Sequence, residues 1–503
     1  MAAIITNKFR IHNAEQFSES FSEAAPNVYY LAIARPQAFA TSTRGDGRTD
    51  NEGTDAAPLT PPDSISREFY DFDDTIAAKK ITSSDISFVI PRRNWTTGTV
   101  YDYYRHDYGE RITGGTTTQT ANSGATNLFD STFYVVSSTF NVYKCLDNND
   151  NASSTVEPTG TSNTILTTGD GYKWKYMYTL SASQQSNFLS TDFMAVATNS
   201  TVSAAAVDGA INIVKIKTGG TGFTTSTGST ISDIPIRGDG SSGTVTVTIT
   251  AGAISDVTVT NAGSGYTFGY ITDADIISGT NAGGAGSGAE LDCVIEPRNL
   301  NSAGSAYGGH GADAVKELGG FFVMLNTNFE GAESGSGSDF TTANDFRKVT
   351  LIRDPQSGGS AASATTLRAT KAIRMAASPT PGTFTVDEEI NQATTGAVGK
   401  VVEWDATNRI LYYIQTRFND QGVDSNGDLT AFSTAAAITG QSSSATATPD
   451  TGFTDTVNGS SFTSGYSSSE LDSDTGDIIY VENRAPITRA TDQTENIKLI
   501  VEF

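Results

Sequence analysis

Histidine and cysteine, on which most nucleophilic and metal sites depend, are scarce in this sequence. Its 503 residues include three histidines, His12, His106 and His310, and two cysteines, Cys145 and Cys293. None of the histidines lies in a nucleophile motif, and their scatter provides no zinc ligand set. The wide spacing of the cysteines favours two buried free thiols over a disulfide. We therefore expect no enzyme activity, no catalytic residues, no metal site and no cofactor.

Positive charge is also scarce, with 32 basic residues against 56 acidic ones and a net charge of −24. Such a chain repels phosphate backbones, which argues against a nucleic-acid partner. It has no apolar run near the roughly 20 residues that a transmembrane helix needs. The first residues, MAAIITNKFRIHNAEQF, lack the apolar core of a signal peptide. We expect a protein without a membrane partner that is made and assembled in the cytoplasm.

Acidic loops raise the question of a calcium site, but the best candidate does not complete a known pattern. The segment DSNGDL places Asp424, Asn426 and Asp428 at the first, third and fifth positions of an EF-hand loop. The sixth position is Leu429 instead of glycine, and the twelfth is Ala435 instead of glutamate. The segment ELDSDTGD (470–477) could hold one ion weakly, but a solvated acidic turn is the favoured interpretation.

The composition favours strands and turns. Charged residues make up only 17% of the chain, against a usual share of about 25%, and glycine contributes 49 residues. Alternating Val/Thr and Ile/Thr segments between Gly- and Ser-rich turns are typical of short strands. Aromatic residues, at 9%, are too frequent for a disordered chain. The sequence predicts a mainly β protein with an antiparallel β-sandwich core and few short helices.

Three short helices and a larger number of strands are expected. Asn13 is the predicted N-cap of the first helix. The second would follow Pro62 and reach Ile76, and the third would lie near 312–318 and stop at Gly319. The predicted strands are 28–34, 86–90, 132–136, 142–146, 172–180, 321–325, 348–352, 478–482 and 497–503.

Residues 210–297 contain an internal repeat, in which AINIVKIKTGGTGFT (210–224) aligns with AISDVTVTNAGSGYT (253–267). Each copy is followed by a Gly/Ser turn and a further alternating strand. Two copies fall short of the roughly three that a solenoid needs, so we expect one small β-module made of two similar halves. Its glycines are predicted to have positive φ at strand ends, and Phe223 and Tyr266 to cap the apolar face.

A second block carries a hairpin signal, with candidate strands at 398–404 and 410–414. Insertions are tolerated at surface loop tips, so both blocks are interpreted as insertions into one domain. The predicted organisation is core β-sandwich at 1–200, an inserted Gly-rich two-copy module at 201–297, core again at 298–365, an inserted β-rich module and loop at 366–465, and core C-terminal strands at 466–503.

Five stretches of the predicted core carry a family resemblance. In order, they are SFVIPRRNW (87–95), VYKCLD (142–147), EP with GDGYKWKYMYTL (157–158 and 169–180), FRKVTLIRDP (346–355) and YVENRAPITRATDQTENIKLIVEF (480–503). Together they resemble the gene-product-eight family, the baseplate wedge subunits of T-even-type contractile-tailed bacteriophages. The blocks at 201–297 and 366–465 depart from the family pattern and leave the outer partners open.

The resemblance implies a structural protein of the virion, a component of the tail baseplate, with a multi-layer antiparallel β-sandwich. It also implies a late protein that forms a homodimer within each wedge and is assembled in the host cytoplasm. Its partners would be other baseplate wedge proteins of the same phage. Such subunits act mechanically, by holding neighbours together and repacking when the tail contracts.

Aromatic and arginine anchors are typical of protein–protein interfaces. In SFVIPRRNW, a local arginine pair beside a tryptophan has this character in an otherwise acidic chain. The candidate interface residues are Arg92, Arg93, Trp95, Tyr101, Tyr103, Tyr104 and Arg484. The other interpretation is that Arg92 or Arg93 pairs with an internal acid and that Trp95 closes the edge of the sandwich.

Two further functions stay open. A tail-associated glycan-binding or glycan-cleaving protein would need a carboxylate pair in an aromatic-lined groove, and no motif selects one among the 56 acidic residues. A secreted adhesin would need an export signal, which the first residues do not contain.

Overall fold

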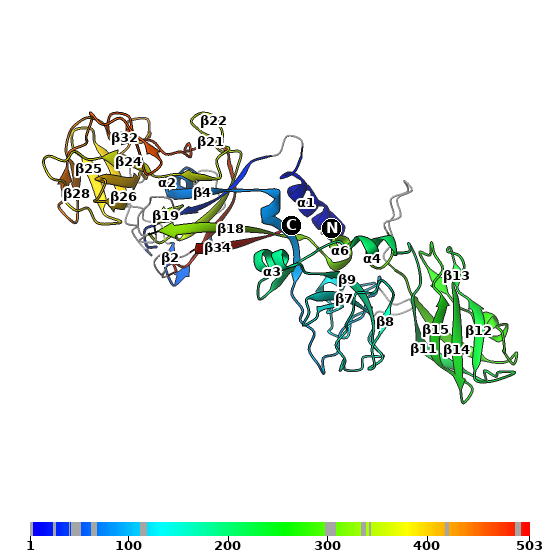
Figure 1. Ribbon diagram of the computed structural model, residues 1–503. Helices are drawn as coiled ribbons and strands as arrows, with labels where there is room; N and C mark the ends of the chain where they lie inside the picture. Colours follow the sequence, from blue (N-terminus) through cyan, green and yellow to red (C-terminus); the bar gives the residue numbers. More distant parts are fainter. Residues whose placement is uncertain are drawn as a thin grey trace. The chain divides into compact units, whose positions relative to one another are not determined.

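The computed structural model describes residues 4–23, 27–39, 41, 52–61, 68–110, 118–296, 308–332, 339–341, 344–417, 422–487 and 494–503. The structure is mainly β, with 40% strand and 11% helix, which confirms the predicted fold class. The chain divides into two compact units (Figure 1). Unit 1 contains Met1–Gln16, Ser87–Met324 and Ile500–Phe503, and unit 2 contains Phe17–Ile86 and Leu325–Leu499.

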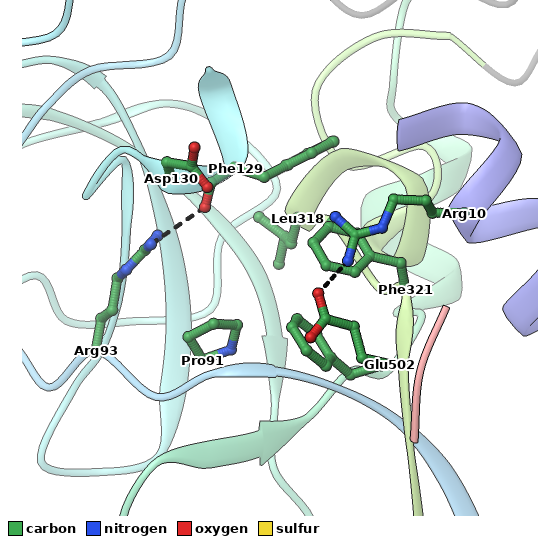
Figure 2. A pocket seen from close by; sticks show the side chains of 10 residues that line it. Arg10, Pro91, Arg93, Phe129, Asp130, Leu318, Phe321 and Glu502 are labelled. Atoms are coloured by element: carbon green, nitrogen blue, oxygen red, sulfur yellow. Dashed lines mark hydrogen bonds and ion pairs between the residues drawn. The ribbon is translucent and has the colours of Figure 1, made fainter. Parts of the chain in front are cut away.

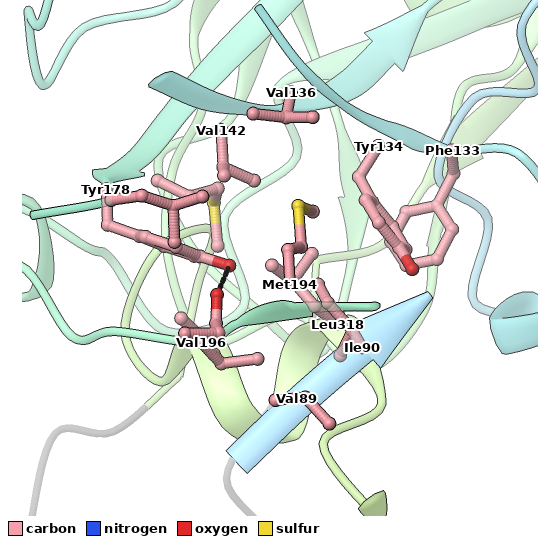
Figure 3. Packing of buried hydrophobic residues seen from close by; sticks show 14 of the residues in the cluster. Val89, Ile90, Phe133, Tyr134, Val136, Val142, Tyr178, Met194, Val196 and Leu318 are labelled. Atoms are coloured by element: carbon pink, nitrogen blue, oxygen red, sulfur yellow. Dashed lines mark hydrogen bonds between the residues drawn. The ribbon is translucent and has the colours of Figure 1, made fainter. Parts of the chain in front are cut away.

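The core of unit 1 is formed by two sheets that share one hydrophobic cluster. The first, of order β6-β7-β9-β8, consists of β6 (Tyr134–Val136), β7 (Asn141–Asp147), β8 (Leu166–Thr167) and β9 (Lys173–Thr179). In the second, β5 (Ile86–Pro91) pairs with β10 (Phe193–Ala195). Val89 and Met194 from the second sheet pack with Val142 and Tyr178 from the first (Figure 3). Side chains from two facing sheets thus fill one core, as in a β-sandwich.

Short helices and two long strands complete this core. The helices are α1 (Asn7–Glu19), α3 (Ala182–Phe188), α4 (Ser200–Ala204) and α6 (Ala314–Leu318). The long strands are β18 (Phe322–Ala332) and β34 (Thr494–Glu502), which pair with each other and contribute residues to both units. Both cysteines are buried and free, as predicted.

Residues 213–294 form a module with a hydrophobic cluster of its own. Its elements are β11 (Ile213–Thr221), β12 (Thr230–Pro235), β13 (Arg237–Gly238), β14 (Thr244–Thr250), β15 (Ala253–Asn261), β16 (Gly269–Tyr270), α5 (Asp273–Ile277) and β17 (Ser287–Val294). The two copies of the repeat exchange strands, because β11 pairs with β17 and β15 pairs with β14. Neither half can satisfy its backbone hydrogen bonds alone, so the halves form one folding unit.

The turn and cap residues of the repeat lie as the sequence predicts. Gly220 and Gly263 occupy equivalent positions and have φ values of 65° and 61°. The equivalent rings of Phe223 and Tyr266 are 2% and 1% exposed. The Tyr266 ring lies against the other copy, since a Cβ added to Gly240 would be 2.4 Å from it. Glycine is required there because a side chain would overlap the ring.

Unit 2 contains two larger sheets. The first, of order β23-β4-β1-β20-β33, consists of β1 (Tyr29–Ala34), β4 (Thr75–Ile81), β20 (Lys348–Arg353), β23 (Thr366–Arg368) and β33 (Asp477–Asn483). The second, of order β29-β28-β25-β26-β27-β24-β32, consists of β24 (Lys371–Arg374), β25 (Glu389–Gln392), β26 (Ala397–Asp405), β27 (Ile410–Ile414), β28 (Ile438–Gly440), β29 (Thr446–Ala447) and β32 (Tyr466–Ser467). The second sheet gathers its own buried cluster. The predicted hairpin corresponds to β26 and β27.

Small elements occupy the connections. The strand pairs are β2 (Gly53–Thr54) with β3 (Ala57–Pro58), β21 (Gln356–Ser357) with β22 (Ser360–Ala361), and β30 (Thr456–Val457) with β31 (Ser460–Ser461). The others are α2 (Glu68–Asp73), β19 (Phe340–Thr341) and two 3₁₀ turns, Ser83–Asp85 and Leu128–Asp130.

The predicted strands are confirmed with shifted ends, but two of the three predicted helices have different bounds. Helix α1 begins well before Asn13, because the Thr6 hydroxyl accepts a hydrogen bond from the Phe9 N–H (3.3 Å) and caps the helix. Helix α2 ends before Ile76, which lies in the buried strand β4, and residues 62–67 lie outside the described part. The third helix ends at Gly319 with φ 81°, as predicted.

Candidate partner-binding groove

Arg93 is the predicted interface residue that lines a hollow in the surface of unit 1. It follows the end of β5 and lies over the Tyr134 ring, with 4.5 Å between Cζ and the ring centroid. Its Nη2 donates to the Phe129 carbonyl (3.2 Å). Its Nη1 is buried and has no hydrogen-bond partner among the residues that the structure describes. Buried guanidinium groups are normally hydrogen-bonded, so the Arg93 Nη1 is a donor that can still take an acceptor.

A groove with a volume of about 310 Å³ opens beside Arg93, and we call it the Arg93 groove (Figure 2). Helix α1, the segment after β5, the 3₁₀ turn Leu128–Asp130, the end of α6, the start of β18 and the end of β34 all contribute to it. Its lining residues are Arg10, Pro91, Arg93, Phe129, Asp130, Leu318, Gly319, Phe321, Phe322 and Glu502. Aromatic rings and both signs of charge therefore meet in one hollow, as in the anchor regions of protein interfaces.

One wall of the groove joins the first helix to the end of the last strand. Arg10 forms an ion pair with Glu502 (Figure 2). Its Nε also donates to the Phe503 carbonyl. Its guanidinium lies over the Phe321 ring, 3.7 Å from the centroid. The Phe503 N–H donates to the Phe321 carbonyl (3.1 Å). These contacts hold an aromatic face and a carboxylate in place at the rim of the groove.

Arg92 and Trp95 make their hydrogen bonds within unit 1. Arg92 donates to the Ser190 carbonyl (3.0 Å) and does not line the groove. The Trp95 indole N–H donates to the Ser154 hydroxyl (3.0 Å), and its ring packs at the edge of a buried cluster. No internal acid pairs with either arginine among the described residues.

The three tyrosines lie at different depths. Tyr101 and Tyr104 are each 4% exposed, so they have little surface left to bury against a partner. Tyr103 is half-buried, and its hydroxyl accepts a hydrogen bond from Arg105 (3.2 Å). Burial raises the pKa of Tyr104 well above its ordinary value. Tyr101 and Tyr104 therefore pack in the core beneath the surface.

Arg484 belongs to unit 2, apart from the other six candidates in the division of the chain. Its guanidinium lies over the Phe346 ring, 5.3 Å from the centroid. Its backbone N–H donates to the Arg347 carbonyl (2.8 Å), which continues the pairing of β20 and β33. Both contacts anchor the loop after β33.

Sequence reasoning missed most of the groove. Only Arg93 was singled out, whereas Arg10, Asp130 and Glu502 come from distant segments with no shared motif. The one local signal was the Phe321–Phe322 pair directly after two glycines. Adjacent aromatic residues at the start of a strand place one ring outside the core, because side chains alternate along a strand.

Unit 1 also contains a buried polar cluster of Lys144, Glu296, His310 and Glu317. Lys144 pairs with Glu317, and Glu296 accepts hydrogen bonds from the His310 backbone N–H (2.9 Å) and the Asn212 side chain. Burial raises the pKa of Glu296 to about 8 and lowers that of His310 well below its ordinary value. The two carboxylates accept hydrogen bonds beneath the surface, whereas the buried His310 Nδ1 has no hydrogen-bond partner among the described residues.

Comparison with known proteins bears on the C-terminal part of the chain. Residues 447–503 match the family model Phage-Gp8, described as Bacteriophage T4, Gp8. A search of the curated proteins finds no match. In the described residues, no helix has the length and apolar character needed to cross a membrane. The matched segment includes β33 and β34 and contributes Glu502 to the Arg93 groove. This match indicates a structural role in a phage baseplate, and thus a place in the virion.

Proposed function

We propose that this protein is a non-enzymatic wedge subunit of a contractile phage tail baseplate. The observation that carries the proposal is the family match of residues 447–503, whose last strand forms a wall of the Arg93 groove. The order of the four upstream stretches that resemble the same family supports it further. The subunit would be made and assembled in the host cytoplasm.

The Arg93 groove is the proposed anchor site for a neighbouring wedge protein. A partner side chain with a carboxylate or carbonyl oxygen would enter the groove beside Arg93, and a shift of the guanidinium would bring the unused Nη1 donor to that oxygen. The rings of Phe129 and Phe321 would cover its apolar part. Burying such an oxygen against an unpaired guanidinium donor stabilises a complex, because the donor is already desolvated.

The ion pair at the rim is suited to repacking during contraction. The side chains of Arg10 and Glu502 are 24% and 60% exposed. Exposed ion pairs of this kind contribute about 0–1 kcal/mol, so a neighbour could exchange with either partner at little cost. Groove contacts could then break and re-form while the two sheets of the core stay packed.

We further propose a homodimer as the unit of assembly, with the exposed parts of Arg92, Arg93, Trp95, Tyr103 and Arg484 at partner contacts. Light scattering at several protein concentrations tests this proposal against the chain mass of 52.8 kDa. A mass of twice this value at every concentration would support a preformed dimer. A monomer would contradict the dimer, and a stable trimer would contradict the wedge assignment and favour a fibre or tailspike.

A pair of neighbouring arginines provides a matched test of the groove. Arg93→Lys removes the unused Nη1 donor and keeps the charge, whereas Arg92→Lys makes the same change outside the groove. We expect Arg93→Lys to weaken incorporation into baseplates about tenfold, equivalent to about 1.4 kcal/mol. Incorporation is measured by complementing a phage that lacks the wild-type subunit. Equal incorporation of the two variants would contradict the role of the groove.

A further inference from the structure

Two aromatic side chains project from the repeat module, one from the short strand β16 and one from the residue before it. Phe268 is 54% exposed and Tyr270 is 50% exposed. Their rings are parallel within 2°, with centroids 6.5 Å apart. We call this pair the aromatic platform. Large apolar side chains that are both exposed and aligned mark binding surfaces more often than isolated ones do.

The backbone beneath the platform is held rigidly. Gly269, between the two aromatic residues, faces the core so closely that an added Cβ would lie 2.6 Å from Ile211 Cδ1. Side chains alternate along a strand, so this inward contact turns both rings outward. Asp239 accepts hydrogen bonds from the Thr267 N–H (2.8 Å) and the Phe268 N–H (3.3 Å). The backbone that carries the two rings is therefore held in place, which lowers the entropy cost of binding.

The first copy of the internal repeat has no aromatic residues at the places of these two rings. Continuing the alignment of the two copies without a gap places Thr225 opposite Phe268 and Thr227 opposite Tyr270. Thr227 is exposed and Thr225 is half-buried, so the first copy presents small polar side chains at the same places. Since one half of the module folds with threonines there, the repeat pattern does not itself require aromatic residues at these places.

Charged groups of both signs border the platform. Arg237 lies opposite Tyr270 in the β13–β16 pair, and its half-exposed guanidinium forms an ion pair with Asp275 (2.6 Å). On the other side, hydrogen bonds from Thr267 lower the pKa of Asp239 to about 2, so this carboxylate is ionised at neutral pH. The border offers donors and acceptors with no excess of positive charge. Together with the net charge of −24, it disfavours phosphate-rich or other anionic ligands.

We propose that the aromatic platform binds a neutral glycan. The apolar C–H face of a sugar ring stacks on an aromatic face, and parallel rings suit consecutive sugars of one chain. The sugar hydroxyls would donate to Asp239 and accept from Arg237. This site lies on the module and does not depend on the proposed wedge function.

Affinity electrophoresis of the full-length protein tests the proposal, in gels cast with dextran, mannan, galactomannan or hydroxyethyl cellulose. We expect at least one polymer to retard the wild type and the variant Phe268→Thr/Tyr270→Thr to bind it at least tenfold more weakly. That variant installs the residues of the first copy, and the single variants check that either ring contributes. The control is Phe9→Thr, which removes a ring of similar exposure (52%) from α1 and should leave retardation unchanged.

Three results would overturn the proposal. They are no retardation in any of the four polymers, equal retardation of wild type and double variant, and a change in oligomeric mass of the double variant without a change in retardation. The last result would assign the platform to a contact between copies of this chain. Thermal unfolding of the double variant must match the wild type, and if it does not, the single variants replace it in the comparison.

Discussion

Lys144 and Glu317 form an ion pair inside unit 1, with side chains that are 0% and 4% exposed. Lys144 lies in β7, within one of the stretches that resemble the wedge family, and Glu317 lies in α6. The Glu317 carboxylate also accepts hydrogen bonds from the backbone N–H groups of Gly311 (2.9 Å) and Asp313 (3.1 Å). The pair therefore joins the sheet to the loop that precedes α6.

Lys144→Met is expected to lower the free energy of unfolding by about 3–5 kcal/mol. Removal of one partner leaves the Glu317 charge buried without its cation, which costs more than the pair itself contributes. Urea denaturation measures the change. Lys173→Met is the control, because the Lys173–Asp147 pair is longer (3.6 Å) and Lys173 is 33% exposed. That variant should lose at most about 1 kcal/mol, and equal losses in both would contradict the importance of burial.

Glu296 should make stability depend on pH. Burial raises its pKa from 4.5 to about 8, so the folded chain holds this proton more tightly than the unfolded chain. Its contribution is fully present below about pH 4.5 and is lost as the pH rises toward 8. Glu296→Gln removes the titration and keeps an acceptor for the His310 N–H. The stability of the wild type relative to this variant should fall by about 1.4 kcal/mol per pH unit between pH 5 and 8.

The comparison with the variant also removes the opposing effect of His310. The pKa of His310 is lowered, so that its contribution rises with pH up to about 6.5 in both proteins. Denaturation curves collected at each pH provide the difference. A difference that stays constant from pH 5 to 8 would show that Glu296 does not carry a raised pKa.

Gly240→Ala should destabilise the repeat module by about 1–3 kcal/mol, because the new methyl group would overlap the Tyr266 ring. Differential scanning calorimetry should show a lower transition temperature for the module. Gly169→Ala in the same unit is the control, since its Cβ would meet only a Val156 methyl at an ordinary 3.8 Å. A module that tolerates both changes equally would contradict the packing of the two halves.

The inserted-module interpretation can be tested by excision. Ile213 and Val294 are register partners in neighbouring antiparallel strands, so an Asn-Gly linker can replace residues 214–293. Both flanking residues belong to the core cluster of unit 1 and are retained. We expect a folded remainder with a cooperative thermal transition and an unchanged oligomeric mass.

The corresponding excision in unit 2 joins Ala372 to Ser467, which are also register partners. The sheet removed has its own buried cluster, so the rest of unit 2 should keep its β-sheet circular dichroism. Aggregation or loss of cooperativity in either shortened chain would show that the block is part of the core.

Strand prediction succeeded where local chemistry decides. The alternating segments became β7, β9, β20 and β33 with small shifts at their ends. Gly319 ended a helix because only glycine adopts its φ of 81° without cost. The first helix was misplaced because two residues offered a capping side chain, Thr6 and Asn13, and the sequence does not show which one the fold uses.

The candidate site was harder to predict because its residues converge only after folding. The motif SFVIPRRNW identified Arg93, but a local motif cannot show that Arg10 and Glu502 lie beside it. The motif also cannot show that Arg93 lines the groove and Arg92 does not. The Arg92 side chain instead donates hydrogen bonds to the Ser190 carbonyl and the Asn94 side chain. Only the structure shows that Tyr101 and Tyr104 are buried, because an aromatic residue in a loop can face either the core or the solvent.

The repeat module shows most clearly which features the sequence determines and which the tertiary structure decides. Its alternating strands, positive-φ glycines and capping rings follow from residue chemistry and can be read from the aligned copies. The exchange of strands between the copies, and the parallel alignment of Phe268 and Tyr270, follow from pairing between distant segments. Pairing of this kind depends on how the whole chain minimises unpaired backbone groups and exposed apolar area, and a local sequence window contains neither quantity.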